Sequence, residues 1–217
     1  VELMAYNNLN KEKALLWRIT HIQNIPWILA NGLHARNGAE YSPDWVTIGN
    51  LDLINRRGHR SVPISPGGVL NDYVPFYFTP FSPMLYNIYT GRGGVRHFPN
   101  KDIVILVSSL ERISALGLPF VFTDRHAYTV TANFYNRLEH LDQIDWLLLQ
   151  RRNFQRDSDD PEKVERYQAE AMVRGQVPIH ALLGVVCYTE RAQEELQKQV
   201  DRLGIGLNIH CLPHWYF

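Results

Sequence analysis

The sequence predicts a single domain of the α+β class built around a mixed sheet. Its 217 residues correspond to about one domain. A hydrophobic content of 45% with 20% charged residues provides enough apolar side chains for a packed core. The segments with strand character are separated by short, unequal helices and long loops. This irregular spacing excludes a doubly wound parallel sheet and favours a mixed one.

The first part of the chain is predicted to contain a polar tail, residues 1–14, followed by the start of a domain that covers residues 15–217. The Asn31-Gly32 pair ends the first helix, because glycine readily adopts the backbone conformation that closes a helix. Clustered proline and glycine place residues 61–71 in a loop. In chain order the predicted elements are a strand at Leu15–Thr20, a helix at His21–Ala30, a helix at Asn50–Arg57, a buried aromatic strand at Tyr73–Thr79, a short helix at Pro83–Tyr89, a strand at Asp102–Ser108, a short helix ending at Leu116 and a strand at Phe120–Thr123.

The second part is predicted to begin with a helical stretch at Thr131–Arg152, broken near Asp142. The apolar segment Val164–Val173 fits either a helix or a strand, and its composition leaves both open. The helix Glu190–Leu203 is amphipathic and lies between two strands, Leu182–Tyr188 and Leu207–Leu212. Together with the first part, these elements make an α+β fold with a mixed sheet.

Composition excludes several classes of protein. Lys+Arg and Asp+Glu each number 22, so the overall charge indicates no partner. The basic set holds 17 Arg against 5 Lys, which suits phosphates and aromatic rings but also arises in an arginine-rich proteome. Two cysteines outside any CxxC pattern argue against a disulfide scaffold and fit a reducing, cytoplasmic setting. No apolar run approaches the ~20 residues of a membrane span.

Common cofactor and metal motifs do not occur in the sequence. There is no GxGxxG after a strand, no GxxxxGK[ST], no HExxH and no GxSxG. His210, Cys211 and His214 lie close together, but no further ligands accompany them, so we expect no metal site. NAD⁺ remains open as a substrate bound by a fold of another kind.

Two polar segments are candidates for ligand binding. In 17–24, polar side chains follow a strand and open a helix, where an anion or amide can bind. The alternative is an ordinary cap at Thr20 with His21 and Asn24 on the surface. In 55–60, three arginines occur without an acid between residues 53 and 71, which suits a phosphate but also an ordinary solvated surface.

An aromatic run and a carboxylate in an apolar run are further candidates. Residues 73–81 hold five aromatics, which belong by default to the core, although one on the open face could stack on a nicotinamide or a base. Glu170 enters the apolar segment 167–173, where a buried carboxylate is costly unless it is paired or functional. If the segment is a helix, Glu170 is exposed. His126 at a strand end is a weaker candidate.

Six segments in this order resemble one known family, from about Trp17 to the C-terminus. They are Arg18-Ile19-Thr20-His21-Ile22-x-Asn24, Arg56-Arg57, Asp72-Tyr73-Val74-Pro75-Phe76-Tyr77-Phe78, Ser82-Pro83-Met84-Leu85-Tyr86, Phe120-Val121-Phe122-Thr123-Asp124-Arg125-His126 and Gln168-Ala169-Glu170. Each is weak alone, but the full series is specific. On these residues the chain resembles the DarT family of DNA ADP-ribosyltransferase toxins.

The resemblance implies an ADP-ribosyltransferase-like fold, with a split, mostly antiparallel sheet and NAD⁺ in the cleft between its halves. The family transfers ADP-ribose from NAD⁺ to a base of single-stranded DNA, thymine in one branch and guanine in another. It also implies a macrodomain antitoxin, DarG, as partner. A same-fold enzyme acting on RNA or protein and an inactive nucleic-acid-binding module are the alternatives. Arg18 occupies a position where some relatives have His.

The resemblance also assigns residues. Glu170 would stabilise the oxocarbenium-like cation that forms when nicotinamide leaves, and Arg57 would act on the acceptor base. Arginine stays protonated in proteins, so electrostatic stabilisation of a deprotonated thymine is the preferred role for Arg57. The implied NAD⁺-binding residues are Arg18, Ile19, Thr20, Trp27, Leu33 and Arg57. The implied DNA-side residues are His126, Met84 and Arg56.

Overall fold

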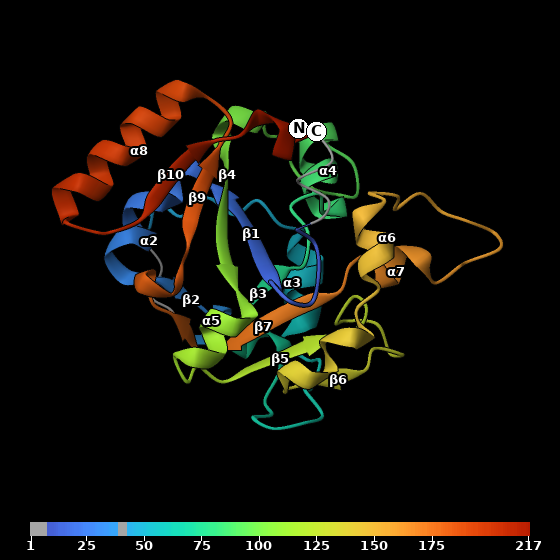
Figure 1. Cartoon of the computed structure of the whole chain (residues 1–217). Coiled ribbons are helices and arrows are strands. Elements are labelled where there is room, and N and C mark those ends of the chain that lie inside the picture. The colour runs from blue at the N-terminus through green and yellow to red at the C-terminus, as the bar shows by residue number, and fades with distance from the viewer. Residues whose placement is uncertain (1–7, 39–42) are drawn as a thin grey trace.

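A mixed eight-stranded sheet forms the centre of the computed structural model, which describes residues 8–38 and 43–217 (Figure 1). Its strands are β1 (Leu15–His21), β3 (Tyr73–Tyr77), β4 (Ile103–Ser109), β5 (Phe120–Thr123), β6 (Phe134–Tyr135), β7 (Glu170–Arg174), β9 (Gly184–Cys187) and β10 (Asn208–Cys211). The strand order is β10-β9-β4-β1-β3-β7-β5-β6. β10 and β9 run parallel and the other neighbours run antiparallel. The predicted α+β class and the mixed, mostly antiparallel sheet are confirmed.

The sheet is split in its middle, between β1 and β3. β1 pairs with β4 from Leu15 to His21. Between β1 and β3, the described register consists of one pair, Trp17 opposite Tyr77. Beyond that pair the two strands diverge, and the Arg18 guanidinium bridges the gap by donating to the Pro75 carbonyl at 2.8 Å. The two half-sheets, β10-β9-β4-β1 and β3-β7-β5-β6, therefore border an opening between them.

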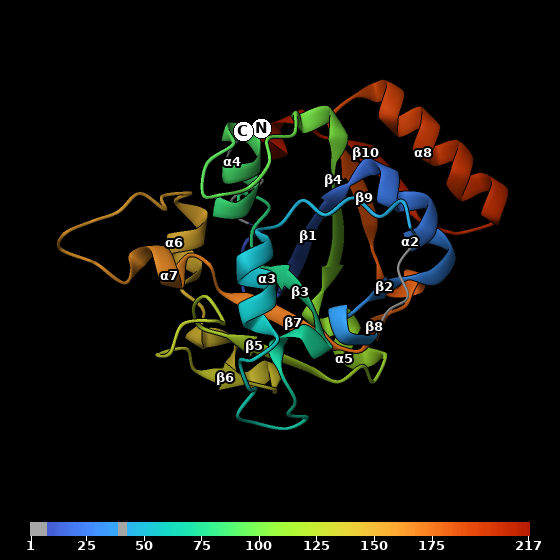
Figure 2. The ribbon, with the colours of Figure 1, turned by 180° about the vertical axis from the view of Figure 1, so that it is seen from behind.

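Short helices cover the sheet, and side-chain caps set where several of them begin. The helices are α2 (Ile25–Asn31), α3 (Leu51–Arg57), α4 (Pro83–Thr90), α5 (Leu110–Ala115), α6 (Trp146–Gln150), α7 (Lys163–Arg166) and α8 (Glu190–Leu203). Asn50, Ser82 and Thr189 each accept a backbone N–H in the first turn of α3, α4 and α8. α8 lies against β9 and β10 at one edge, while α3 lies in front of β3 and β7 in Figure 2.

Two predicted helices are wrong in part. Thr131–Arg152 contains strand β6, a 3-10 segment at Leu138–Gln143 and the short helix α6. Tyr135 stacks on Phe122 of β5 with ring centroids 5.3 Å apart, and this packing outweighs the local helical pattern. The helix predicted at His21–Ala30 begins later, because β1 continues to His21 and α2 starts at Ile25. The ambiguous segment Val164–Val173 contains most of α7 and then the first four residues of β7.

A short strand pair was not predicted. β2 (Leu33–His34) pairs with β8 (Gln176–Val177). Gly32 precedes it with φ +78°, and an added Cβ would lie 2.6 Å from the Val177 carbonyl oxygen. The chain passes so close at this point that glycine is required.

Residues before β1 contribute to the core. Leu9 and Ala14 are buried among core side chains, and the Leu9 carbonyl accepts from the Gln150 side chain at 2.8 Å. Residues 1–7 of the predicted tail lie outside the described residues. Within 8–38 and 43–217, no helix combines the length and apolar character needed to cross a membrane.

Candidate active site

A buried carboxylate–guanidinium pair lies at the opening between the two half-sheets. Glu170 is the first residue of β7 and Arg57 is the last of α3. Arg57 Nη1 lies 2.9 Å from Glu170 Oε2 and 3.1 Å from Oε1. The two residues, Glu170 and Arg57, are 2% and 8% exposed, so water screens the pair poorly. The fold brings together two residues that the sequence singled out far apart in the chain.

The surroundings keep Glu170 ionised. Its Oε1 also accepts the Ala127 N–H at 3.1 Å. Burial by itself raises the pKa of this carboxyl, but the Arg57 guanidinium and the Ala127 N–H oppose burial and hold the pKa below its ordinary value. A carboxylate that is both buried and charged can stabilise a cation that forms beside it.

His126 stands beside the pair as a neutral group. Its Nδ1 lies 3.8 Å from Glu170 Oε1 and accepts the Tyr128 N–H at 3.2 Å. Burial lowers the pKa of His126, and Glu170 only partly opposes that effect. A neutral imidazole can exchange hydrogen bonds with a polar ligand without adding charge to the site.

The pair opens into a cavity of about 190 Å³ between β1, α3 and the start of β7. Its walls come from parts of the chain that lie far apart in the sequence. Figure 2 shows α3 crossing in front of β3 and β7, and residues of all three elements line this cavity. The lining residues include Arg18, Ile19, Thr20, Trp45, Ile48, Asn50, Ile54, Arg57, Asn71, Tyr73, Tyr77, Met84, His126 and Glu170.

Polar residues at the end of β1 and directly after it are buried, and one of them, Thr20, lines the cavity. Asn24 donates to Thr20 Oγ1 at 3.0 Å and to the Val46 carbonyl at 2.8 Å, and its Oδ1 accepts the Val46 N–H. The alternative of a Thr20 cap with His21 and Asn24 at the surface is therefore wrong. His21 is the residue that precedes the 3-10 turn, and its ring accepts the Gln23 N–H.

Three residues assigned by resemblance lie outside the described cavity lining. Trp27 packs edge-on against Trp45 at 5.6 Å, so it supports the wall from behind. Leu33 is buried in the core opposite Val177. Arg56 is exposed, unlike its buried neighbour in the same turn of α3.

Tyr77 is a site residue that the sequence did not single out. It faces Glu170 across β3 and β7 and donates its hydroxyl to Met84 Sδ at 3.4 Å. Burial, with Glu170 nearby, raises the pKa of Tyr77, so the phenol stays neutral. The alternation within the aromatic run was the available signal, since it places alternate rings on the open face. The sequence could not identify the Ala127 N–H as a donor of the site, because every residue other than proline has a backbone N–H.

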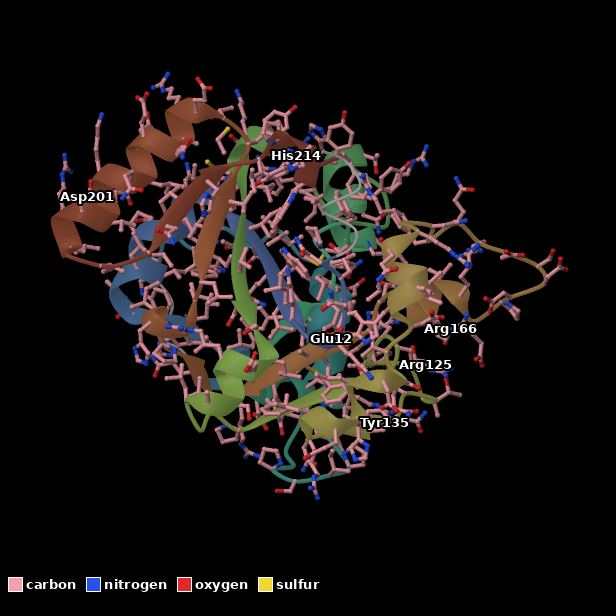
Figure 3. The ribbon with its side chains drawn as sticks, viewed as in Figure 1. Glu12, Arg125, Tyr135, Arg166, Asp201 and His214 are labelled. Carbon is pink, nitrogen blue, oxygen red and sulfur yellow. The ribbon has the colours of Figure 1, made fainter. Side chains whose placement is uncertain are left out.

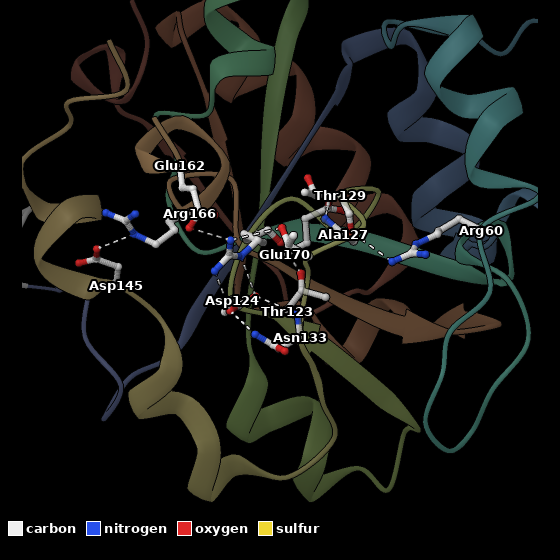
Figure 4. A network of polar contacts seen from close by, with 12 residues as sticks. Arg60, Thr123, Asp124, Ala127, Thr129, Asn133, Asp145, Glu162, Arg166 and Glu170 are labelled. Carbon is white, nitrogen blue, oxygen red and sulfur yellow. Dashed lines mark hydrogen bonds and ion pairs between the residues drawn. The ribbon is translucent and has the colours of Figure 1, made fainter. Parts of the chain in front are cut away.

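The loop between β5 and β6 holds His126 and Ala127 in place (Figure 4). At its base, the Asp124 carboxylate accepts the Asn133 N–H at 3.0 Å and the Asn133 side chain at 2.9 Å. Across the cleft, Arg60 of the segment after α3 donates to the Thr129 carbonyl at 3.1 Å. The loop is thus bonded to Glu170 through the Ala127 N–H and to the segment after α3 through Arg60.

We expect Asp124→Ala to lower kcat/KM about 10- to 100-fold, because the loop that carries the Ala127 N–H would lose its fixed position. Stability should fall by about 1–3 kcal/mol, since Asn133 loses its buried acceptor. Thermal unfolding and steady-state kinetics on the folded protein would measure the two effects separately. Asp142→Ala removes an exposed acid that follows the same loop and should leave both values unchanged. A kcat/KM within two-fold of the parent, together with the stability loss, would contradict a positioning role.

No group of three or more His, Cys, Asp or Glu side chains that could hold a metal occurs in residues 8–38 and 43–217. His210, Cys211 and His214, which are close in sequence, are not part of such a group among these residues. His214 lies away from the loop that carries Arg125 (Figure 3).

Comparisons with known proteins agree on one family. A family model described as "ssDNA thymidine ADP-ribosyltransferase, DarT" matches residues 17–217. A DNA ADP-ribosyl transferase of Escherichia coli O127:H6 is 52% identical over 99% of this chain and 100% of that protein. A DNA ADP-ribosyl transferase of Thermus sp. strain 2.9 is 41% identical over 86% of this chain and 87% of that protein.

Solved structures agree with the sequence relatives. Thermus sp. 2.9 DarT in complex with ADP-ribosylated ssDNA matches with a TM-score of 0.86 at 37% identity, over 95% of this chain and 97% of that one. The same protein in complex with NAD⁺ matches with a TM-score of 0.82 at 36% identity, over 95% and 98%. Thermosipho africanus DarTG in complex with ADP-ribose matches with a TM-score of 0.74 at 20% identity, over 94% of this chain and 51% of that one, and shows the fold alone.

A split sheet with a buried Glu–Arg pair in its cleft, together with these matches, defines an NAD⁺-dependent ADP-ribosyltransferase that acts on DNA. The chain belongs to the DarT family.

Proposed function

We propose that Glu170 and Arg57 carry the transfer of ADP-ribose from NAD⁺ to a thymine base of single-stranded DNA. The observation that carries this proposal is the charged, buried Glu170 carboxylate at the cavity wall. As the bond between nicotinamide and ribose breaks, positive charge develops on the ribose. Glu170 stabilises that charge and hydrogen-bonds a ribose hydroxyl, and the dry surroundings strengthen both effects.

Arg57 acts on the acceptor base in this proposal. Thymine N3 carries a proton, so the base reacts best once that proton has passed to solvent water. Arg57 stays protonated and stabilises the deprotonated base electrostatically. Its Nη1 is held by Glu170, while its Nη2 contacts only the weak acceptor Met172 Sδ at 3.7 Å among the described partners. An anionic base would therefore give Nη2 a stronger acceptor than the one it has.

The remaining roles divide between the two substrates. Arg18, Ile19 and Thr20 orient the nicotinamide end of NAD⁺, and their position along β1 in the cavity wall supports this assignment. Trp27 and Leu33 shape the pocket from behind this wall. His126 and Met84 face the acceptor base across the cavity from β1. Arg56 at the exposed end of α3 attracts the DNA backbone.

The biological setting follows from the family. We propose that the protein is the toxin of a toxin–antitoxin pair and that a macrodomain protein of the DarG type removes its mark. We further propose that the enzyme works in the cytoplasm, where NAD⁺ and transiently single-stranded DNA occur together.

Oligonucleotides that each lack one base would test the acceptor. Incubation with NAD⁺ and mass spectrometry of the product should show modification of every strand except the thymine-free one. The annealed duplex should be a poor acceptor, because thymine N3 is then paired and freeing the base costs a few kcal/mol. EDTA should not alter the rate. Modification of the thymine-free strand, or preferential modification of RNA or protein, would overturn the assignment.

A further inference from the structure

A second hollow lies on the other side of α4 from the catalytic cavity. We call it the arginine–aromatic basin, and its defining residues are Arg92, Arg152, Arg156, Tyr86, Phe154 and Phe217. It is wide and open, with a volume of about 1040 Å³. Side-chain amides add to its described lining, and none of the described lining residues is Asp or Glu. The basin therefore combines cations, rings and amides without a carboxylate side chain.

The three rings of the basin form one half-buried cluster. Tyr86 and Phe217 have centroids 5.3 Å apart, and Phe154 lies 5.8 Å from Tyr86 and 5.9 Å from Phe217. Each ring keeps part of its surface open, so the cluster is a wall rather than a sealed core. Open aromatic surface beside arginines is the combination that binds unpaired bases regardless of their identity.

Two acids of the loop that follows the basin residue Arg156 are paired with cations elsewhere. Asp157 lies 3.2 Å from Lys163, and Asp160 lies 2.7 Å from Arg166. These acids are therefore paired with cations outside the basin lining. Arg152 is fixed by its contact with the Phe81 ring, whose centroid lies 3.4 Å from the guanidinium carbon. The described lining of the basin therefore offers a polyanion guanidinium groups and no Asp or Glu side chain.

The basin and the catalytic cavity share their dividing wall. In α4, Met84 lines the catalytic cavity, whereas Tyr86 and Asn87 line the basin. At the start of β7, Glu170 lines the cavity, whereas Gln168, two residues earlier, lines the basin. The two hollows are therefore bordered by the same two elements, α4 and the segment at the start of β7.

We propose that the arginine–aromatic basin binds the nucleotides that flank the acceptor base, with phosphates on the arginines and bases against the aromatic cluster. The ligand class is a single-stranded polynucleotide. The inference rests on the proposed function, because it presumes that a base of such a strand enters the catalytic cavity. In this proposal, the enzyme prefers single-stranded DNA partly because of the basin, since bases paired in a duplex cannot lie against these rings.

The test compares a long single strand containing one thymine with a minimal thymidine dinucleotide. The double variant Arg92→Ala/Arg156→Ala should raise KM for the long strand about 5- to 10-fold and leave kcat and the KM for NAD⁺ unchanged. The salt slope of DNA binding should fall by about 0.7 for each phosphate that the variant no longer neutralises. With the dinucleotide, the variant and the parent should behave alike. Tyr86→Leu should give the same pattern without the change in salt slope.

Arg191→Ala on α8 is the matched control, since it removes an exposed arginine that lines neither hollow. An unchanged KM and salt slope for the long strand in the double variant would overturn the proposal that the basin binds DNA. An equal rise in KM with the dinucleotide would also overturn it, because these residues would then act on the catalytic cavity. Failure of the proposed function looks different, because the parent protein would then modify neither acceptor. Acceptors extended only on the 5′ or only on the 3′ side would show which flank the basin holds.

Discussion

Glu170→Gln should lower the rate of ADP-ribose transfer by a factor of about 10²–10³ or more, because the neutral amide cannot stabilise the cation that forms on the ribose. The shape of the side chain is preserved, and the amide oxygen can still accept the Ala127 N–H. The loss should appear in kcat rather than in the KM for NAD⁺, since the charge develops in the transition state. Single-turnover transfer to a thymine-containing strand is the direct measurement.

Folding must be measured beside activity in this variant. Glu170→Gln leaves Arg57 buried without a charged partner, which costs several kcal/mol in comparable pairs. Circular dichroism and thermal unfolding would establish that the protein assayed is folded. Glu139→Gln, at an exposed acid, serves as the matched control and should retain full activity. Near-parental transfer by folded Glu170→Gln would remove Glu170 from the mechanism.

Arg57→Ala should abolish efficient transfer and move the acid limb of the pH–rate profile upward. In the parent protein Arg57 opposes burial and keeps the pKa of Glu170 below its ordinary value near 4.5. Without the guanidinium, burial acts with less opposition and raises that pKa. Glu170 then takes up a proton at a pH where the parent carboxylate is still charged. Residual kcat/KM, measured from neutral pH down to about pH 4, should fall at a higher pH in the variant.

The contribution of Glu170 to stability should depend on pH with opposite sign in the two proteins. A carboxyl with a lowered pKa stabilises the folded parent above the ordinary pKa, and this contribution is lost as the pH falls through the lowered value. A carboxyl with a raised pKa stabilises the folded variant at acid pH, and that contribution is lost as the pH rises. Urea unfolding at both ends of the range measures this, with Arg137→Ala at an exposed position as the control. Parallel pH dependence in both proteins would contradict the coupling of Arg57 to Glu170.

Several features of the fold could be predicted from the sequence because they depend on nearby residues. The helix Glu190–Leu203 was predicted with the bounds it has in the structure, since its apolar periodicity and Gly204 specify it locally. β4 is buried throughout and was recognisable as an apolar run bounded by polar residues. The same holds for Glu170, because a carboxylate that enters an apolar run is unusual in any context.

The structure of the segment Thr131–Arg152 could not be predicted from its local sequence. Its residues fit a helix taken alone, but Phe134 and Tyr135 complete the edge of the sheet beside β5. Burial of Tyr135 against Phe122 and the cap that Asp145 gives to α6 decide the outcome. The partners of β6 lie on another element, so no single stretch of the sequence contains all the interactions that decide between helix and strand.

The sequence by itself determined the fold class, the family resemblance and the two charged residues of the site, because composition, periodicity and motif order are properties of the chain. Only the tertiary structure decided that Arg57 and Glu170 lie 2.9 Å apart and that the Ala127 N–H joins them. It also placed Tyr77 opposite Glu170 and moved Trp27 and Leu33 behind the cavity wall. The physical reason is that the sheet splits beside the Trp17–Tyr77 pair, and a cleft between strands distant in sequence arises from packing rather than from local propensity.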